Sequence, residues 1–132
     1  MAQAMIYYLA WQEDDWLDEL LDFFPAVNAV VPTLKTLDLM RHQRAEGLAD
    51  QRLVVLNPAG EEAKSREFLQ SLTADPDWKA APLYIVGLTE HQAPAWQEAY
   101  PQAKVIVITG FAVEFDYEGV MRQMQADLEG SA

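Results

Sequence analysis

The sequence contains no cysteine and only two histidines among its 132 residues. A chain without cysteine has no disulfide bond, no thiolate nucleophile and no cysteine-ligated metal. His42 lies among polar residues of an expected helix, and His91 lies in an expected loop. We therefore expect both to be solvated, and their separation does not suit a zinc-binding pair. The lack of cysteine fits a reducing compartment, so we expect a cytoplasmic protein.

Positive charge is also scarce. There are 9 lysines and arginines against 21 acidic residues, for a formal net charge of −12. Such a surface repels the phosphates of nucleic acids and of anionic membranes. No hydrophobic run approaches the ~18 residues that span a bilayer, and the N-terminus lacks the basic stretch of a signal peptide. We expect neither nucleic acid nor membrane to be a direct partner of this domain.

What the chain does contain is a repeated alternation of short hydrophobic runs and longer helical periods, with 51% hydrophobic residues overall. Strands are predicted at 5–11, 29–31, 53–56, 83–88 and 104–109. Helices are predicted at 16–24, 34–47, 61–72, 95–100 and 113–128. Five strand–helix units in sequence predict right-handed crossovers and a parallel sheet covered on both faces. We expect one α/β domain over residues 1–132, a three-layer (βα)5 flavodoxin-like fold with strand order 2-1-3-4-5.

The carboxyl ends of the strands are where such a sheet places its ligand crevice. The third strand delivers Asn57 there, directly before Pro58. An amide is not a carboxylate nucleophile, so Asn57 cannot form an acyl phosphate. It can instead satisfy backbone groups in the turn before Pro58. Thr89 and Thr109 follow the fourth and fifth strands.

Three strand endings together resemble the response-regulator receiver family, over nearly the whole length of the chain. These endings are Leu53–Pro58, Ile85–Thr89 and Val105–Phe111. The resemblance implies a phosphoacceptor aspartate after the third strand, a Ser or Thr that senses the phosphoryl group after the fourth, and a lysine after the fifth. It also implies a pair of magnesium-binding acids after the first strand.

The chain departs from this family at most of those positions. Asn57 replaces the acceptor, Thr109 stands at the lysine position, and Ala10 and Trp11 align best with the acid pair. Only Thr89 matches, and it is also a natural turn or cap residue. The resemblance therefore identifies a degenerate phosphosite made of Ala10, Trp11, Asn57, Thr89 and Thr109. We predict that Trp11 fills the space of the metal-binding acids.

The acids that follow the first strand leave two interpretations open. A short shift of that strand would bring Glu13 and Asp14 to the crevice, where carboxylates are the usual ligands of magnesium. Alternatively, Asp14 or Asp15 caps the helix that follows. We predict no bound metal and no cofactor.

The leading functional hypothesis is a pseudo-receiver: a signalling domain that acts by protein–protein contact, without phosphorylation and without enzymatic activity. The resemblance implies contact surfaces, often for a homodimer, on the fourth helix, fifth strand and fifth helix. The candidate interface residues there, some of which must be core, are Trp96, Tyr100, Lys104, Tyr117 and Met121. The tryptophans at 78 and 96 either pack under their loops or lie in an interface.

The alternative function is a small-molecule binder or enzyme that uses the crevice. It would rely on Glu13, Asp14, Asn57, Thr89 and His91. The sequence has no G-x-G-x-x-G after a strand, no P-loop lysine and no G-x-S-x-G elbow to name a chemistry.

Overall fold

Five parallel strands form one sheet in the order β2-β1-β3-β4-β5, which confirms the predicted topology. The computed structural model describes residues 4–108 and 115–131. The strands are β1 (Ala4–Ala10), β2 (Val27–Val30), β3 (Gln51–Asn57), β4 (Leu83–Ile85) and β5 (Lys104–Val105). The helices are α1 (Asp15–Phe23), α2 (Leu34–Ala45), α3 (Glu62–Ala74), α4 (Ala93–Ala99) and α5 (Tyr117–Glu129).

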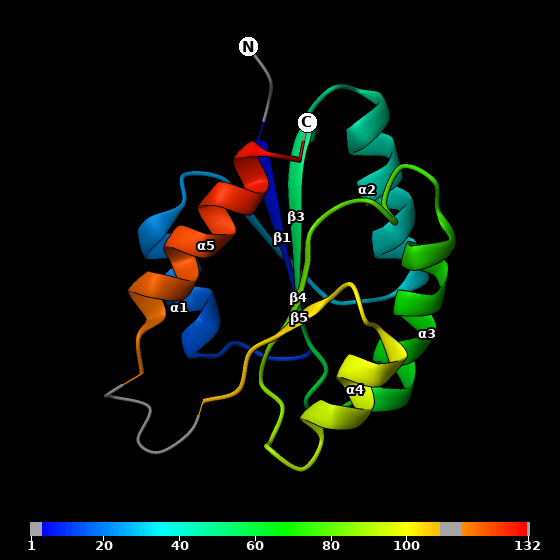
Figure 1. Ribbon diagram of the computed structural model, residues 1–132. Coiled ribbons are helices and arrows are strands. Elements are labelled where there is room, and N and C mark those ends of the chain that lie inside the picture. The colour runs from blue at the N-terminus through cyan, green and yellow to red at the C-terminus, as the bar shows by residue number, and fades with distance from the viewer. Residues whose placement is uncertain (1–3, 109–114, 132) are drawn as a thin grey trace.

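The helices cover the sheet on both faces (Figure 1). Helices α1 and α5 lie on one face, and α2, α3 and α4 lie on the other. Each face buries its own hydrophobic cluster because side chains alternate along the strands. Tyr7 and Val54 belong to the cluster under α2, α3 and α4, whereas Tyr8 and Val55 belong to the cluster under α1 and α5. The central strand β3 is buried on both sides, as its apolar sequence predicts.

Side-chain caps fix the starts of α1 and α2 at or beside the predicted positions, whereas α5 begins at Tyr117 rather than at residue 113. Asp14 caps α1 through a bond from the backbone N–H of Leu17, and Thr33 caps α2 through a bond from Thr36. Trp16 packs on the core face of α1, while Trp78 and Trp96 are each 1% exposed. The expectation that the latter two pack under their loops is confirmed.

Some boundaries differ from the prediction. β4 ends at Ile85 rather than at residue 88, because Gly87 adopts a φ of +80° that breaks the extended backbone. β5 pairs over two residues only. Residues 109–114, which include Thr109 and Val113, lie outside the described residues.

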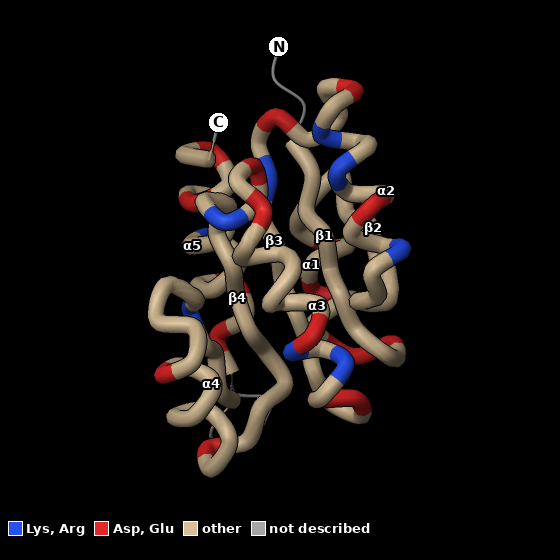
Figure 2. The backbone as a smooth tube through the Cα atoms, turned by 90° about the vertical axis from the view of Figure 1, so that its right-hand side faces the viewer, with Lys and Arg blue, Asp and Glu red and all other residues tan. Residues whose placement is uncertain are grey.

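Acidic positions are spread along the chain trace, with the fewer basic positions among them (Figure 2). None of the helices within residues 4–108 and 115–131 has the length and apolar character that crossing a bilayer requires.

Candidate functional site

The carboxyl ends of β1 and β3 lie side by side, and they define the candidate site. Ala10, the last residue of β1, is the register partner of Asn57, the last residue of β3. The chain that leaves β4 remains attached to β3, because the N–H of Val86 donates to the carbonyl of Leu56 at 2.9 Å. Because neighbouring parallel strands end at the same edge of the sheet, the residues that follow them lie close together there.

The amide of Asn57 is buried there, and both its nitrogen and its oxygen are hydrogen-bonded. Its side chain is 7% exposed. Nδ2 donates to Asp14 Oδ2 at 2.6 Å and to the hydroxyl oxygen of Tyr8 at 3.4 Å. Oδ1 accepts from the N–H of Ala59 at 3.1 Å, which closes the turn around Pro58. The predicted turn role of Asn57 is confirmed, and both N–H donors of the amide are already used.

Asp14 both caps α1 and lies at the carboxyl end of β3, the two positions between which the sequence did not decide. Its Oδ1 accepts from the N–H of Leu17 at 3.0 Å and so caps α1. Its Oδ2 accepts from Asn57 and from the hydroxyl of Tyr8. One carboxylate thus fixes the start of α1 over the end of β3. Glu13, the other candidate acid, is exposed and lines a hollow of about 240 Å³ beside β1 and β2, which Tyr8 also lines.

Tyr8 supplies a hydroxyl that stays protonated. Burial raises the pKa of Tyr8, and the hydrogen bond to the Asp14 carboxylate raises it further, while the bond from Asn57 lowers it. The ring belongs to the core under α1 and α5, and the hydroxyl reaches the carboxyl end of the sheet from within that core. Tyr8 therefore acts as a permanent hydrogen-bond donor to Asp14 rather than as a base.

Gly87 makes room for the Asn57 side chain. A Cβ at this position would lie 2.2 Å from Asn57 Oδ1, and the positive φ already disfavours other residues. The close approach of backbone to amide is the reason that a glycine stands here.

Trp11, which is predicted to fill the space of the metal-binding acids, has its side chain against α3. Its Nε1 donates to Ser65 Oγ on α3 at 2.8 Å, and Lys64 Nζ lies 5.8 Å from its ring centroid. The side chains that contact the Asn57 amide are those of Tyr8 and Asp14. Trp11 is thus directed toward α3, and its place in the space of the metal-binding acids stays a prediction.

The remaining predicted residues are not joined to this network. Thr89 is exposed and accepts from the N–H of Gln92 at 3.3 Å, as expected of a turn residue at the start of α4. His91 is exposed in that turn, and His42 is exposed and pairs with Glu46. Within residues 4–108 and 115–131, no hydrogen bond joins Thr89 or His91 to the Asn57 side chain. Thr109 is outside the described residues.

The donor set does not fit the magnesium ion that the family resemblance implies. Magnesium needs several oxygen ligands in octahedral geometry. Around Asp14, the neighbouring groups are an N–H of Leu17, the NH2 of Asn57 and the O–H of Tyr8, and all three already donate to its oxygens. Within the ranges that the structure describes, no three acidic or histidine residues form a metal-holding group.

The predicted interface residues divide into core and surface. Trp96 and Met121 are each 1% exposed, so they pack inside and do not contact a partner. Tyr100 and Tyr117 are half-buried, and Lys104 is exposed with its Nζ 2.6 Å from Asp127 Oδ2. The prediction that Trp96 and Met121 lie in an interface is therefore wrong, because α4 and α5 direct these two side chains toward the sheet.

Sequence reasoning missed Tyr8 and Gly87. A tyrosine two residues before the end of a buried strand carries no signal that its hydroxyl will reach the crevice. Gly87 did carry one, since a glycine within a strand pattern often marks a close backbone approach.

Comparison with known proteins supports the fold. A sensor protein from Polaromonas sp. JS666 superposes with a TM-score of 0.60 at 11% identity, covering 96% of this chain and 98% of that one. A response regulator receiver domain from Rhodospirillum rubrum superposes with a TM-score of 0.59 at 16% identity, covering 96% and 94%. No protein-family model and no curated protein matches the sequence. The chain therefore has a receiver-like fold.

Proposed function

We propose that this chain is a signalling or regulatory domain that acts through protein–protein contact and not through phosphorylation or catalysis. The observation that supports this most strongly is the engagement of Asn57 by Asp14 and Tyr8 at the position of the phosphoacceptor. A residue with an amide in place of a carboxylate has no nucleophilic oxygen that could accept a phosphoryl group.

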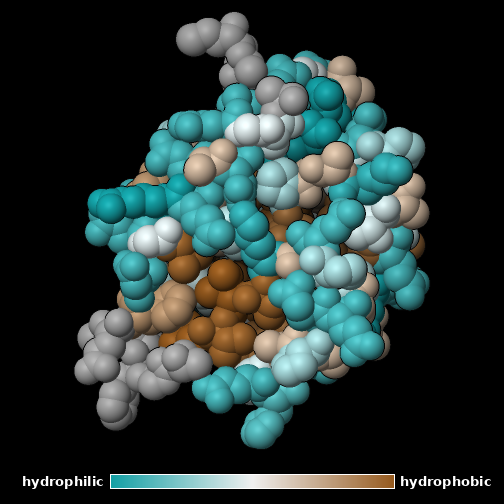
Figure 3. All heavy atoms as spheres, viewed as in Figure 1, coloured by the Kyte–Doolittle hydropathy of each residue, from teal (hydrophilic) through white to brown (hydrophobic). Residues whose placement is uncertain are grey.

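The contact surface we propose is the open edge of the sheet at β5. Among the strands of the described residues, β5 pairs with β4 alone. Residues 105–108 are apolar and only half-buried, and Figure 3 shows a hydrophobic area over the segment that leaves β5. Contiguous apolar surface of this kind commonly marks a protein-binding site. Lys104, at the start of β5, stays within the proposed interface.

Phosphotransfer is tested by incubating the purified chain with acetyl phosphate and Mg²⁺ and measuring its intact mass. We expect no phosphorylated species in the wild type. We also expect none in Asn57→Asp, because Ala10 and Trp11 stand at the positions of the metal-binding acids and Thr109 at that of the lysine. A phosphorylated mass in either protein would contradict the proposal.

The surface is tested by capturing partners from an extract of the source cells with the immobilised chain. Val107→Asp places a charge on the β5 edge and should abolish capture. Leu39→Asp is the matched control, because Leu39 is 44% exposed on α2 and away from β5. Equal capture by both variants would show that the β5 edge is not the contact surface.

A further inference from the structure

The β5 edge, which is the outer side of residues 105–108, continues as extended chain beyond the residues that pair with β4. Its side chains alternate between the two faces of the sheet. Val105 packs with the cluster under α2, α3 and α4, whereas Ile106 and Ile108 pack with the cluster under α1 and α5. Val107 lines the same hollow as Val105. Alternation of this kind is typical of a strand, so the β5 edge is long enough to pair with a further strand.

The backbone of the β5 edge presents hydrogen-bonding groups on its outer side. The N–H of Ile106 donates to the carbonyl of Ile85 at 2.9 Å, so Ile106 faces β4. Because successive residues of a strand direct their backbone groups to opposite sides, Val105 and Val107 direct theirs away from the sheet. Neither forms a backbone hydrogen bond on that side with any residue in 4–108 or 115–131. Each therefore offers one N–H and one C=O to a partner.

A groove beside these backbone groups has room for side chains. It has a volume of about 330 Å³ between α4 and the β5 edge, and Val105 and Val107 line it. Two compact residues of α4, Ala93 and Pro94, form part of its other wall. A strand added to the β5 edge would place every second side chain on this face of the sheet. The groove therefore fits a partner with apolar side chains at alternating positions.

The composition of the β5 edge leaves it open to pairing. Edge strands are commonly protected by lysines, prolines or bulges. Residues 105–108 are instead four β-branched apolar residues in a row. The neighbouring Lys104 is held by α5, with its Nζ 2.6 Å from Asp127 Oδ2. An apolar edge of this kind is a template for a further strand.

Negative charge surrounds the β5 edge. Residues 80–132, which supply β4, α4, β5 and α5, contain two basic residues and seven acidic ones, at positions 90, 98, 114, 116, 118, 127 and 129. Both basic residues are paired within the chain, Lys104 with Asp127 and Arg122 with Glu118. The acidic residues thus outnumber the basic ones around this edge, and a positively charged partner is complementary to it.

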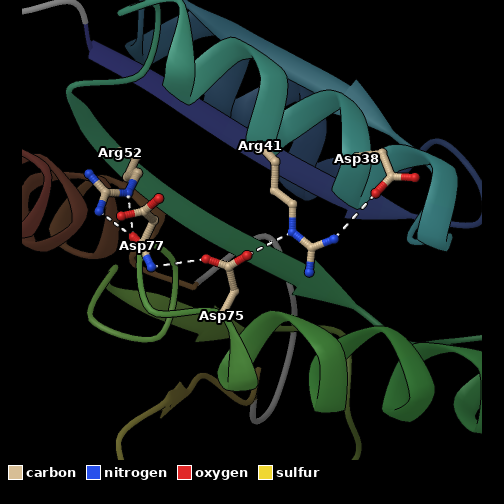
Figure 4. Close-up of polar contacts among 5 residues, drawn as sticks. All are labelled: Asp38, Arg41, Arg52, Asp75 and Asp77. Atoms are coloured by element: carbon tan, nitrogen blue, oxygen red, sulfur yellow. Dashed lines mark hydrogen bonds and ion pairs between the residues drawn. The ribbon is translucent and has the colours of Figure 1, made fainter.

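The other seven basic residues lie at positions 35 to 79, on elements that β4 separates from β5 or that precede them. Figure 4 shows two of them bound to polar groups of the chain itself. Arg41 Nε donates to Asp75 Oδ2 at 2.7 Å, and Arg52 Nε donates to the carbonyl of Asp77 at 3.1 Å. A second copy of the chain would bring a further net charge of −12 to the β5 edge and would be repelled.

We propose that the β5 edge binds an extended, positively charged segment of another protein, which joins the sheet as an additional strand. Its backbone pairs with Val105 and Val107, its alternate apolar side chains enter the groove beside α4, and its basic side chains meet the surrounding carboxylates. In this mode of recognition, main-chain bonds give affinity and the alternate side chains give specificity. The inference rests on the proposed function and names the partner of its contact surface.

The probe for the test is the peptide acetyl-KVKVKVK-amide, titrated into the full ¹⁵N-labelled chain. We expect saturable shifts of the Val105 and Val107 amide signals, and slower hydrogen exchange of both amides in the complex. Ala29 is the internal control, because it is exposed on β2 at the opposite side of the sheet. Shifts no larger than that of Ala29, or full protection of both amides in the free chain, would overturn the proposal.

Two further peptides separate strand geometry from charge. The diastereomer with D-valine has the same charge and apolar content but does not form a regular strand, and it should bind about tenfold more weakly. The acidic peptide acetyl-EVEVEVE-amide should also bind about tenfold more weakly, because its charge has the sign of the surface. Equal affinity of the D-valine peptide would refute strand addition, and equal affinity of the acidic peptide would refute a basic partner.

A variant of the chain tests the main-chain bonds. Val107→Pro removes an outward N–H that the sheet does not use, so it should weaken peptide binding about tenfold and leave the unfolding curve unchanged. Val107→Thr keeps the N–H and the branched shape and should bind within about twofold of wild type. Equal affinities of both variants would contradict strand addition. If Val107→Asp abolished partner capture while the peptide shifted neither amide, strand addition would be wrong and the proposed contact surface would stand.

Discussion

The sheet has a carboxyl edge, where its strands end, and an amino edge, where they begin. These two edges differ in how well their buried polar groups are hydrogen-bonded. At the carboxyl edge, Asn57, Asp14 and Tyr8 satisfy one another. At the amino edge, Trp78 leaves a buried N–H without an acceptor, and so does the Nε of Arg44 near the start of β3, among the residues that the structure describes. A cavity of about 410 Å³ lies at the same amino edge.

This difference shows that the carboxyl edge, where such folds usually bind ligands, can be the edge whose buried polar groups best satisfy one another. Parallel α/β sheets normally bind ligands beyond the carboxyl ends of their strands. Here Asn57, Asp14 and Tyr8 form a closed hydrogen-bond network at the carboxyl ends of the strands. The amino edge is held by pairs that remain partly open to solvent, such as Lys104 and Asp127. Substitutions at the carboxyl edge should therefore cost more stability than comparable ones at the amino edge.

The largest effect is expected from Gly87→Ala. The new Cβ would lie 2.2 Å from Asn57 Oδ1 at a φ of +80°, and we expect a loss of about 4 kcal/mol in the free energy of unfolding. Gly60→Ala is the control, because φ is +94° there but nothing lies within 4 Å. It should cost about 1 kcal/mol in chemical denaturation. Similar losses for both would show that the packing around Asn57 is loose.

Asp14→Ala should cost about 3 kcal/mol, since it removes a helix cap and leaves the Tyr8 hydroxyl and the Asn57 amide without their acceptor. The matched control is Asp18→Ala, which removes an acidic side chain from the first turn of α1 without touching the network. Denaturant unfolding gives both values. A loss for Asp14→Ala no greater than that for Asp18→Ala would mean that the network contributes little.

Asn57→Asp should lower stability by about 2 kcal/mol at neutral pH, because it sets a second carboxylate against Asp14 Oδ2. Mutual repulsion raises the folded-state pKa of this pair. A raised pKa means that the folded state holds its protons more tightly, so the lost stability returns as the pH falls toward the unfolded-state pKa. Unfolding curves from pH 7 to pH 4 check this. A loss that is constant with pH would contradict the expected repulsion.

Asp127→Asn tests the amino edge and should cost only about 0.5 kcal/mol at pH 7, because its ion pair with Lys104 is partly solvated. Burial opposes ionisation of Asp127, but hydrogen bonds from Lys104 and Tyr84 outweigh it and hold the pKa of Asp127 below its usual value. A lowered pKa gives stability above the unfolded-state pKa that is lost as the pH falls through the folded-state pKa. Wild type and variant should therefore converge in strongly acidic solution, as measured by thermal unfolding. If the stability difference between wild type and Asp127→Asn grew as the pH fell, the ionised Asp127 carboxylate would not be the source of the stabilisation at the amino edge.

Much of the architecture could be predicted from the sequence because its signals are local. Apolar runs around Val54 and Ile85 predict buried strands, and the cap at Thr33 predicts the start of α2. Alternation of strand and helix then leaves few topologies. The limits of β4 and β5 were missed, because the length of a ladder depends on how neighbouring strands meet and not on hydropathy.

The nature of the candidate site was only partly visible in the sequence. The amide at Asn57 already excluded a phosphoacceptor there, since that follows from the chemistry of one residue. The placing of Trp11 against Ser65, and of Tyr8 against Asp14, depended on which face of the sheet each side chain takes at the strand end.

By itself, then, the sequence determined the five strand–helix units, the acidic surface and the amide of Asn57 at the end of β3, because each follows from residue type and local spacing. Only the tertiary structure decided that Asp14 closes the carboxyl edge and that a hollow lies under Trp78 at the amino edge. Both depend on contacts between residues more than forty positions apart or on space left between separate elements, such as the pairing of Asn57 with Asp14 and the meeting of α3 with the 99–102 connection. No local pattern encodes such contacts.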